Sequence, residues 1–97
     1  MSETKYEILM TSRFRKDLKR IAKQPDRDLR LLEDVVQMLA DDILLPERYY
    51  DHPLHGNKKG FRECHIQPDW LLIYAKDEKH LYLYLSRTGS HSDLLNL

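Results

Sequence analysis

The stretch FRECHIQPDWLLIYAKDEKHLYLYLS, residues 61–86, decides the fold of this chain. It contains three β-rich runs, Phe61–Ile66, Trp70–Ala75 and His80–Ser86, and the short polar segments between them suit hairpin connections. This pattern predicts three consecutive antiparallel strands. A separate apolar run at residues 6–10 predicts a first strand ahead of them.

Two helices are expected between the first strand and this meander. Apolar residues recur at three- and four-residue spacing over residues 13–23, with Ser12 as the expected N-cap, and again over residues 29–42. The order β-α-α-β-β-β predicts one small α+β domain over residues 1–97, with an antiparallel-rich sheet covered on one face by a helical hairpin. The turn-rich residues 45–59 are expected to form a long loop that reaches toward an active face.

Length and cysteine content limit the class of protein. The 97 residues are enough for one hydrophobic core, and the single cysteine, Cys64, excludes an internal disulfide. No segment approaches the ~20 apolar residues that span a bilayer, and the first residues lack the apolar run of a signal peptide. We therefore expect a cytoplasmic protein without a membrane partner.

The charges are balanced overall but not locally. Sixteen basic and sixteen acidic residues cancel, which argues weakly against a nucleic-acid binder. Residues 13–23, however, carry six Arg or Lys against one Asp, whereas residues 26–42 carry six acids against two Arg. A second basic cluster, Lys58, Lys59 and Arg62, lies beside histidine-containing segments and is better placed to meet phosphates.

Three histidine-containing segments in the second half carry the chemical signal: residues 51–56, 62–70 and 87–91. Histidine titrates near neutral pH, so several histidines with an arginine and an aspartate suit acid–base chemistry on a phosphodiester. RNA supplies its own nucleophile, the ribose 2′-hydroxyl. A nuclease without a metal then needs only a base, an acid and cations that stabilise the charged phosphate.

The same segments, DHPL at 51–54, GFRECHIQPDWLLIY at 60–74 and RTGSH at 87–91, resemble the signature blocks of the YafQ branch of the RelE/ParE toxin superfamily. The resemblance implies a toxin of a bacterial type II toxin–antitoxin pair. It further implies a ribosome-dependent endoribonuclease that cuts messenger RNA in the decoding site and is silenced by a cognate antitoxin. The toxin–antitoxin complex is expected to bind operator DNA through the antitoxin.

The resemblance, carried over position by position, and the basic cluster, which supplies Lys58, Lys59 and Arg62, together give the expected site. The catalytic residues are His52, His65, Asp69, His91 and Arg87. The RNA-binding residues are Trp70, Lys58, Lys59, Arg62 and Leu95. Leu95 stands where the family has an aromatic residue, usually Phe, so stacking on RNA at that position is in question.

Roles within this group are only partly fixed by the sequence. His91 is assigned as the general acid, either Asp69 or His52 as the general base, and Arg87 and His65 as stabilisers of the phosphate. We expect neither a metal nor a cofactor, and products with a 2′,3′-cyclic phosphate and a 5′-hydroxyl.

Other interpretations remain open at this level. The chain could be a catalytically inactive binding module that acts through its antitoxin or the ribosome, or the three histidines with Asp69 could hold a metal. An activity directed at DNA gyrase, as in the ParE branch, is a further alternative that this histidine set disfavours. Trp70 could instead be a core residue, and Arg87 could pair with a surface carboxylate.

Overall fold

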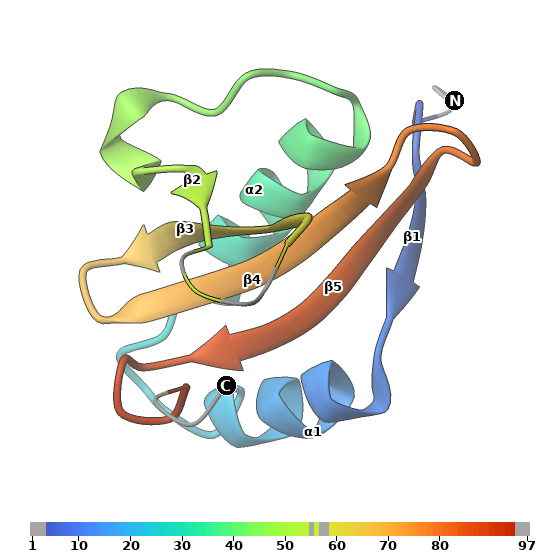
Figure 1. Ribbon diagram of the computed structural model, residues 1–97. Helices are drawn as coiled ribbons and strands as arrows, with labels where there is room; N and C mark the ends of the chain where they lie inside the picture. The colour runs from blue at the N-terminus through green and yellow to red at the C-terminus, as the bar shows by residue number, and fades with distance from the viewer. Residues whose placement is uncertain (1–3, 55, 57–58, 95–97) are drawn as a thin grey trace.

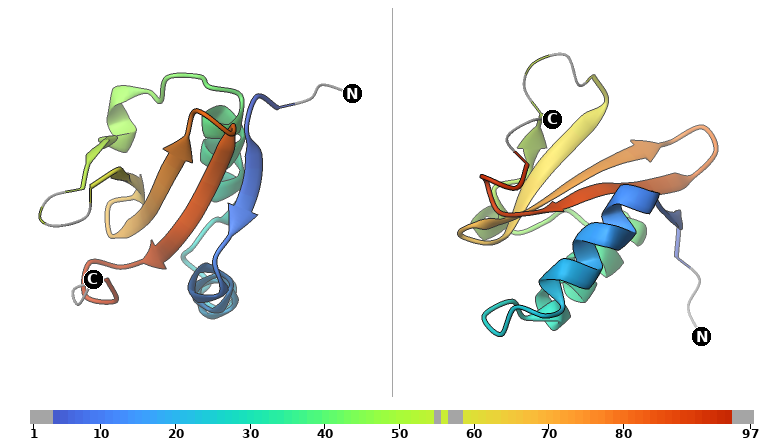
Figure 2. Two further views of the ribbon diagram at one scale, coloured as in Figure 1. Left: turned by 45° about the vertical axis from the view of Figure 1, so that its right-hand side comes forward. Right: turned by 90° about the horizontal axis from the view of Figure 1, so that it is seen from below.

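The computed structural model describes residues 4–54, 56 and 59–94 (Figure 1). Its strands form one mixed sheet in the order β1-β5-β4-β3-β2, and both α-helices lie on the same face of that sheet (Figure 2). The predicted α+β class and the position of the helices are confirmed. The elements are β1 Glu7–Met10, α1 Ser12–Ile21, α2 Leu29–Ala40, the 3₁₀ helix η1 Glu47–Tyr49, β2 His52–Pro53, β3 Phe61–Gln67, β4 Trp70–Asp77 and β5 Tyr82–Gly89.

The first strand pairs with the last. β1 runs parallel to β5, and the other neighbouring strands are antiparallel. β5 extends to Gly89, three residues beyond the predicted end at Ser86, and it carries one extra residue opposite the Ile73–Tyr74 step of β4. This extension brings the chain directly to His91.

Side-chain caps explain where the two helices begin. The Thr11 side chain accepts a hydrogen bond from the Phe14 N–H at 3.0 Å, so Thr11 is the N-cap of α1 and the prediction of Ser12 is one residue late. The Asp28 carboxylate accepts from the Arg30 N–H in the same way, also at 3.0 Å, at the start of α2. α1 packs on β5 and α2 on β3.

The region predicted as one long loop contains two short elements that the sequence pattern did not indicate. η1 and β2 are too short to show periodicity. β2 pairs with β3, with His52 opposite Glu63, and this pairing fixes the position of His52. Lys58 lies outside the described residues, as does His55.

The two faces of the sheet bury different clusters. The helix-covered face contains the main core, including Cys64, Trp70 and Leu72, whereas Leu71 and Ile73 on the open face pack against Leu94. Trp70 is 0% exposed. The prediction of Trp70 as an RNA contact is therefore wrong, because its side chain is enclosed by the core on the face away from Leu71.

Among the described residues, no helix is both long enough and apolar enough to cross a membrane.

Candidate active site

Three histidines from separate segments meet at one end of the open face. His65 on β3 lies between the other two, with its ring centroid 6.5 Å from that of His52 and 5.6 Å from that of His91. We call these three residues the histidine cluster. The sequence separates its members widely, so the fold creates the cluster.

Strand register explains this convergence. His65 pairs with Leu71, and Leu71 pairs in turn with Gly89, two residues before His91. On the other side of β3, His52 pairs with Glu63, which shares a face with His65 because strand residues alternate. The three imidazoles are therefore brought to one face by backbone pairing across four strands.

An aspartate in the turn between β3 and β4 orients His91. Asp69 Oδ1 lies 2.7 Å from His91 Nδ1 and accepts a hydrogen bond from the His91 backbone N–H at 3.1 Å. The hydrogen bond from the His91 side chain lowers the pKa of Asp69 below its ordinary value of 3.8. An ionised Asp69 accepts a hydrogen bond from Nδ1–H, so Nε2 of His91 is the ring nitrogen left to exchange a proton with a substrate.

Both ring nitrogens of His52 face acceptors. Nδ1 lies 2.5 Å from the Tyr50 carbonyl oxygen, and Nε2 lies 3.4 Å from Glu63 Oε1. Glu63 was not among the predicted site residues. Glu63 lies two residues before His65 on the same strand, so the two side chains point to the same face. This two-residue spacing could have identified Glu63 from the sequence.

Arg87 is held by a buried carboxylate on α1. Its Nε and Nη2 donate to the two oxygens of Asp17 at 2.7 and 3.1 Å, and its side chain is only 12% exposed. The hydrogen bond to Asp17 raises the pKa of Arg87. The partner of Arg87 is thus a carboxylate whose side chain is 4% exposed, not a surface group as one interpretation of the sequence had it.

Asp17 also contacts the chain that leads to His91. Its carboxylate accepts the Thr88 backbone N–H at 3.2 Å and a hydrogen bond from Arg20 at 3.3 Å. Arg20 in turn lies 3.6 Å from Asp93, which accepts the Ser90 N–H in the turn that carries His91. α1 therefore holds the end of β5 and the following turn from the opposite side of the sheet.

Arg62, one member of the predicted basic cluster, faces away from the histidines. Arg62 donates to Asp51 at 3.1 Å, and the same Asp51 oxygen accepts the Tyr74 hydroxyl at 2.6 Å. Arg62 shares its strand face with Cys64, opposite the face of His65. Arg62 therefore does not face the histidine cluster, and the RNA-binding roles of Arg62 and of the exposed Lys59 stay predictions. Leu95 lies outside the described residues.

Neither a cysteine nucleophile nor a metal centre is indicated. Cys64 is 0% exposed, and burial raises the pKa of its thiol, which suits a core residue. In the part of the chain that the structure describes, no group of three or more His, Cys, Asp or Glu side chains is arranged to hold a metal ion.

Comparison with known proteins identifies the family of this chain. A family model described as "Bacterial toxin of type II toxin-antitoxin system, YafQ" matches residues 6–96. The mRNA interferase toxin YafQ of Escherichia coli K12 is 38% identical over 89 residues, which cover 91% of this chain and 94% of that protein.

Solved structures extend the agreement to three dimensions. The crystal structure of the E. coli DinJ–YafQ complex matches with a TM-score of 0.84 and 36% identity, over 92% of this chain and 97% of that chain. A metal-bound toxin from Helicobacter pylori matches with a TM-score of 0.86 and 46% identity, over 92% and 98% of the two chains. These matches confirm the resemblance drawn from the sequence: the chain belongs to the YafQ family of toxins of type II toxin–antitoxin systems.

Proposed function

We propose that this chain is a ribosome-dependent, metal-independent endoribonuclease that cleaves messenger RNA by attack of the ribose 2′-hydroxyl. The observation that carries the proposal is the convergence of His52, His65 and His91 on the open face, with Asp69 bound to His91. The E. coli relative is named an mRNA interferase, which supports the same reaction here.

His91 is the general acid. Asp69 holds Nδ1–H and stabilises the imidazolium, so that Nε2–H points away from Asp69 and protonates the departing 5′-oxygen. This arrangement changes one expectation from the sequence. Because the same Asp69 oxygen already accepts the His91 ring N–H and backbone N–H, Asp69 acts as an orienting group and is poorly placed to be the base.

His52 is the general base. The Tyr50 carbonyl oxygen accepts a hydrogen bond from Nδ1–H, so we assign Nε2 as the ring nitrogen that takes the proton of the 2′-hydroxyl. Glu63, 3.4 Å from Nε2, is close enough to stabilise the imidazolium that forms.

His65 stabilises the charge on the phosphate. Its ring lies between the proposed acid and the proposed base, which is where the scissile phosphate must pass. Arg87 retains Nη1 as a donor beyond its two contacts with Asp17, so its contribution to phosphate binding comes from that nitrogen.

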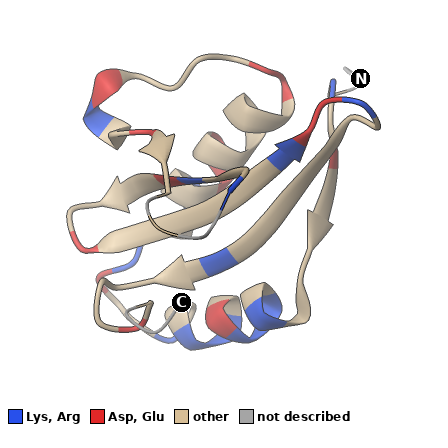
Figure 3. Cartoon of the chain, viewed as in Figure 1, with Lys and Arg blue, Asp and Glu red and all other residues tan. Residues whose placement is uncertain are grey.

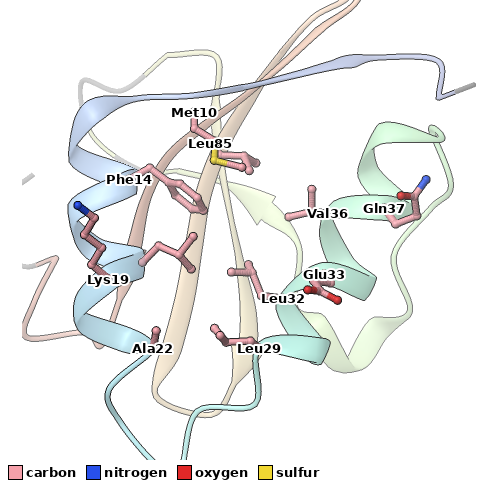
Figure 4. A pocket seen from close by; sticks show the side chains of 11 residues that line it. Met10, Phe14, Lys19, Ala22, Leu29, Leu32, Glu33, Val36, Gln37 and Leu85 are labelled. Atoms are coloured by element: carbon pink, nitrogen blue, oxygen red, sulfur yellow. The ribbon is translucent and has the colours of Figure 1, made fainter.

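A cognate antitoxin is the proposed protein partner. The E. coli relative crystallised with a second protein, DinJ. In this chain an apolar groove of about 620 Å³ runs between α1 and α2, with Lys19 on one rim and Glu33 on the other (Figure 4). Such a groove suits an amphipathic segment. Figure 3 shows that α1 is mostly basic, which suits acidic antitoxin residues or ribosomal RNA.

The toxin–antitoxin complex is proposed to bind operator DNA through the antitoxin, and the free toxin to act in the cytoplasm. Co-expression of the neighbouring gene and co-purification on a tagged toxin test the partner. Isolation of the chain as a freely expressed, non-toxic monomer would count against an antitoxin.

The cleavage reaction is tested by mapping message ends. Ribosomes carrying a defined message are incubated with the purified wild type, and the 5′ ends are mapped by primer extension; cuts within codons are expected. Cleavage should persist with phenanthroline, a chelator that removes transition metals while leaving the Mg²⁺ that ribosomes require, because no step uses a bound metal.

A different outcome would support the alternative function. If abundant pure protein binds ribosomes and leaves the message intact, the chain is a binding module and the nuclease proposal fails. Loss of cleavage with phenanthroline would instead indicate a metal-dependent enzyme.

A further inference from the structure

A pocket of about 440 Å³ opens beside His65, the central member of the histidine cluster. It is lined by η1 residues Arg48 and Tyr49 with the following Tyr50, by the end of β3 and the start of the β3–β4 turn (residues 65–68), and by Leu31 of α2. The pocket thus shares a wall, the His65 ring, with the proposed cleavage site.

Tyr50 is a large aromatic residue that the fold leaves in solvent. It is 68% exposed, yet its ring lies 5.6 Å from that of His65, tilted by 50°. The backbone at Tyr50 is left-handed, with φ of 48°, a conformation that residues with a side chain seldom adopt. An exposed aromatic ring in such a conformation is a feature expected of a binding site rather than of the core.

Two hydrogen bonds hold the backbone of Tyr50 in place. The Tyr50 N–H donates to the Glu47 carbonyl oxygen at 2.9 Å, and the Tyr50 carbonyl oxygen is the acceptor that faces Nδ1 of His52. The backbone of Tyr50 is therefore held relative to the proposed general base. A ligand ring that stacks on Tyr50 would therefore lie at a set position relative to His52.

Arg48 supplies the polar group of the pocket. Its guanidinium lies 4.7 Å from the Tyr49 ring centroid and donates to the Tyr49 hydroxyl at 3.1 Å, which holds it along that wall. The nearby Gln67 amide is already engaged with backbone groups of Asp26 and Asp28. Arg48 is thus a donor available to the acceptor edge of a ligand.

A planar ring with hydrogen-bond acceptors on its edge fits these walls. RNA strands present such rings when they are unstacked, and proteins bind them by stacking on aromatic side chains and by arginine contacts to base edges. Since one wall is His65, the base belongs to a nucleotide that flanks the scissile phosphate.

We propose that Tyr50 and Arg48 form a nucleobase subsite beside the histidine cluster, in which Tyr50 stacks on the base and Arg48 reads its acceptor edge. This inference rests on the proposed function for the identity of the RNA. Stacking on Tyr50 tolerates any base, whereas Arg48 favours guanine, which offers two adjacent acceptors.

The first test uses cleavage on programmed ribosomes. Tyr50→Ala should raise KM by about 5- to 150-fold, the range that corresponds to loss of one base–aromatic stack, and should leave kcat within about threefold. Tyr50→Phe should match the wild type because it keeps the ring. Tyr84→Ala, which removes a partly exposed tyrosine from β5, is the matched control and should change neither constant.

The second test does not depend on cleavage. Message carrying the fluorescent base 2-aminopurine at each nucleotide of the decoding-site codon in turn is bound by the His91→Ala protein on ribosomes. Stacking quenches the fluorescence at one position, and the added Tyr50→Ala change should abolish that quenching. Wild-type cleavage together with unchanged KM and unchanged quenching in Tyr50→Ala would overturn the subsite alone, whereas absence of both cleavage and quenching would overturn the subsite and the nuclease together.

Discussion

The sheet has a charged pair on each face, buried on the helix-covered face and exposed to solvent on the open face. On the covered side, Asp17 is 3% exposed and holds Arg87 through two hydrogen bonds. On the open face, the side chains of His91 and Asp69 are 56% and 63% exposed, although their contact is as short, at 2.7 Å. Exposed pairs contribute little to stability, whereas breaking a buried pair leaves an uncompensated charge. Contacts of equal length therefore contribute differently: the Asp17–Arg87 pair mainly stabilises the fold, whereas the Asp69–His91 pair mainly orients the proposed general acid.

The largest effect is expected from a change on the open face. His52→Ala removes the proposed general base and should lower single-turnover cleavage by about 10²–10⁴-fold. The thermal midpoint of unfolding should stay close to that of the wild type, because His52 is at the surface of a two-residue strand. Cleavage that survives within a few-fold would remove His52 from the mechanism.

On the covered side, a substitution should affect the stability of the fold more than the rate of cleavage. Asp17→Asn removes the charge that neutralises Arg87 and should lower the free energy of unfolding by about 3–5 kcal/mol, measured by urea denaturation. Asp42→Asn is the matched control, because Asp42 also contacts two cations, Lys5 and Lys76, but at an exposed position. A similar loss in both variants would contradict the comparison between the environments.

A smaller effect is expected at Trp70. Its indole N–H donates to Thr88 Oγ1 at 2.7 Å within the core. Trp70→Phe loses this bond and leaves a buried acceptor, so the free energy of unfolding should fall by about 1–3 kcal/mol. The KM for message should not change. A selective rise in KM with unaltered stability would restore Trp70 as an RNA contact.

The smallest effect concerns the ionisation of Asp69. Because the His91 hydrogen bond lowers the pKa of Asp69, its carboxylate should stay ionised as pH falls below 3.8, and the contact should be lost only as pH passes the lowered value. A carbon-detected NMR titration measures this midpoint, which should return toward 3.8 in His91→Ala. A wild-type midpoint at or above 3.8 would show that the pair does not form in solution.

The sequence predicted the elements with clear periodicity and missed those without it. The helices and the long strands follow repeats of apolar residues, but β2 has two residues and shows none. The pairing of β1 with β5 joins residues more than seventy positions apart, which no local pattern reveals. Strand register, and with it the exact meeting of the histidines, likewise depends on long-range pairing.

The sequence motifs picked out the histidines that the fold brings together, but they did not indicate which polar side chains face the helix-covered side of the sheet. Asp17 was overlooked as one acid in a basic stretch, although it lies three residues after Phe14 and four before Ile21, on the buried stripe of α1. Likewise, Arg62 alternates with Glu63 on β3, so the two could not face the same side. Helical and strand periodicity, applied to polar residues as well as to apolar ones, would have indicated which way both side chains face.

The most direct test compares two exposed histidines that each contact an aspartate. His91 and His80 each place Nδ1 close to a carboxylate, at 2.7 Å from Asp69 and 2.8 Å from Asp77, and both pairs are solvent-accessible. Only His91 belongs to the histidine cluster. Single-turnover cleavage of ribosome-bound message should fall by about 10²–10⁴-fold in His91→Ala and stay at the wild-type rate in His80→Ala. Equal rates in the two variants would contradict the claim that the converged imidazoles cut RNA.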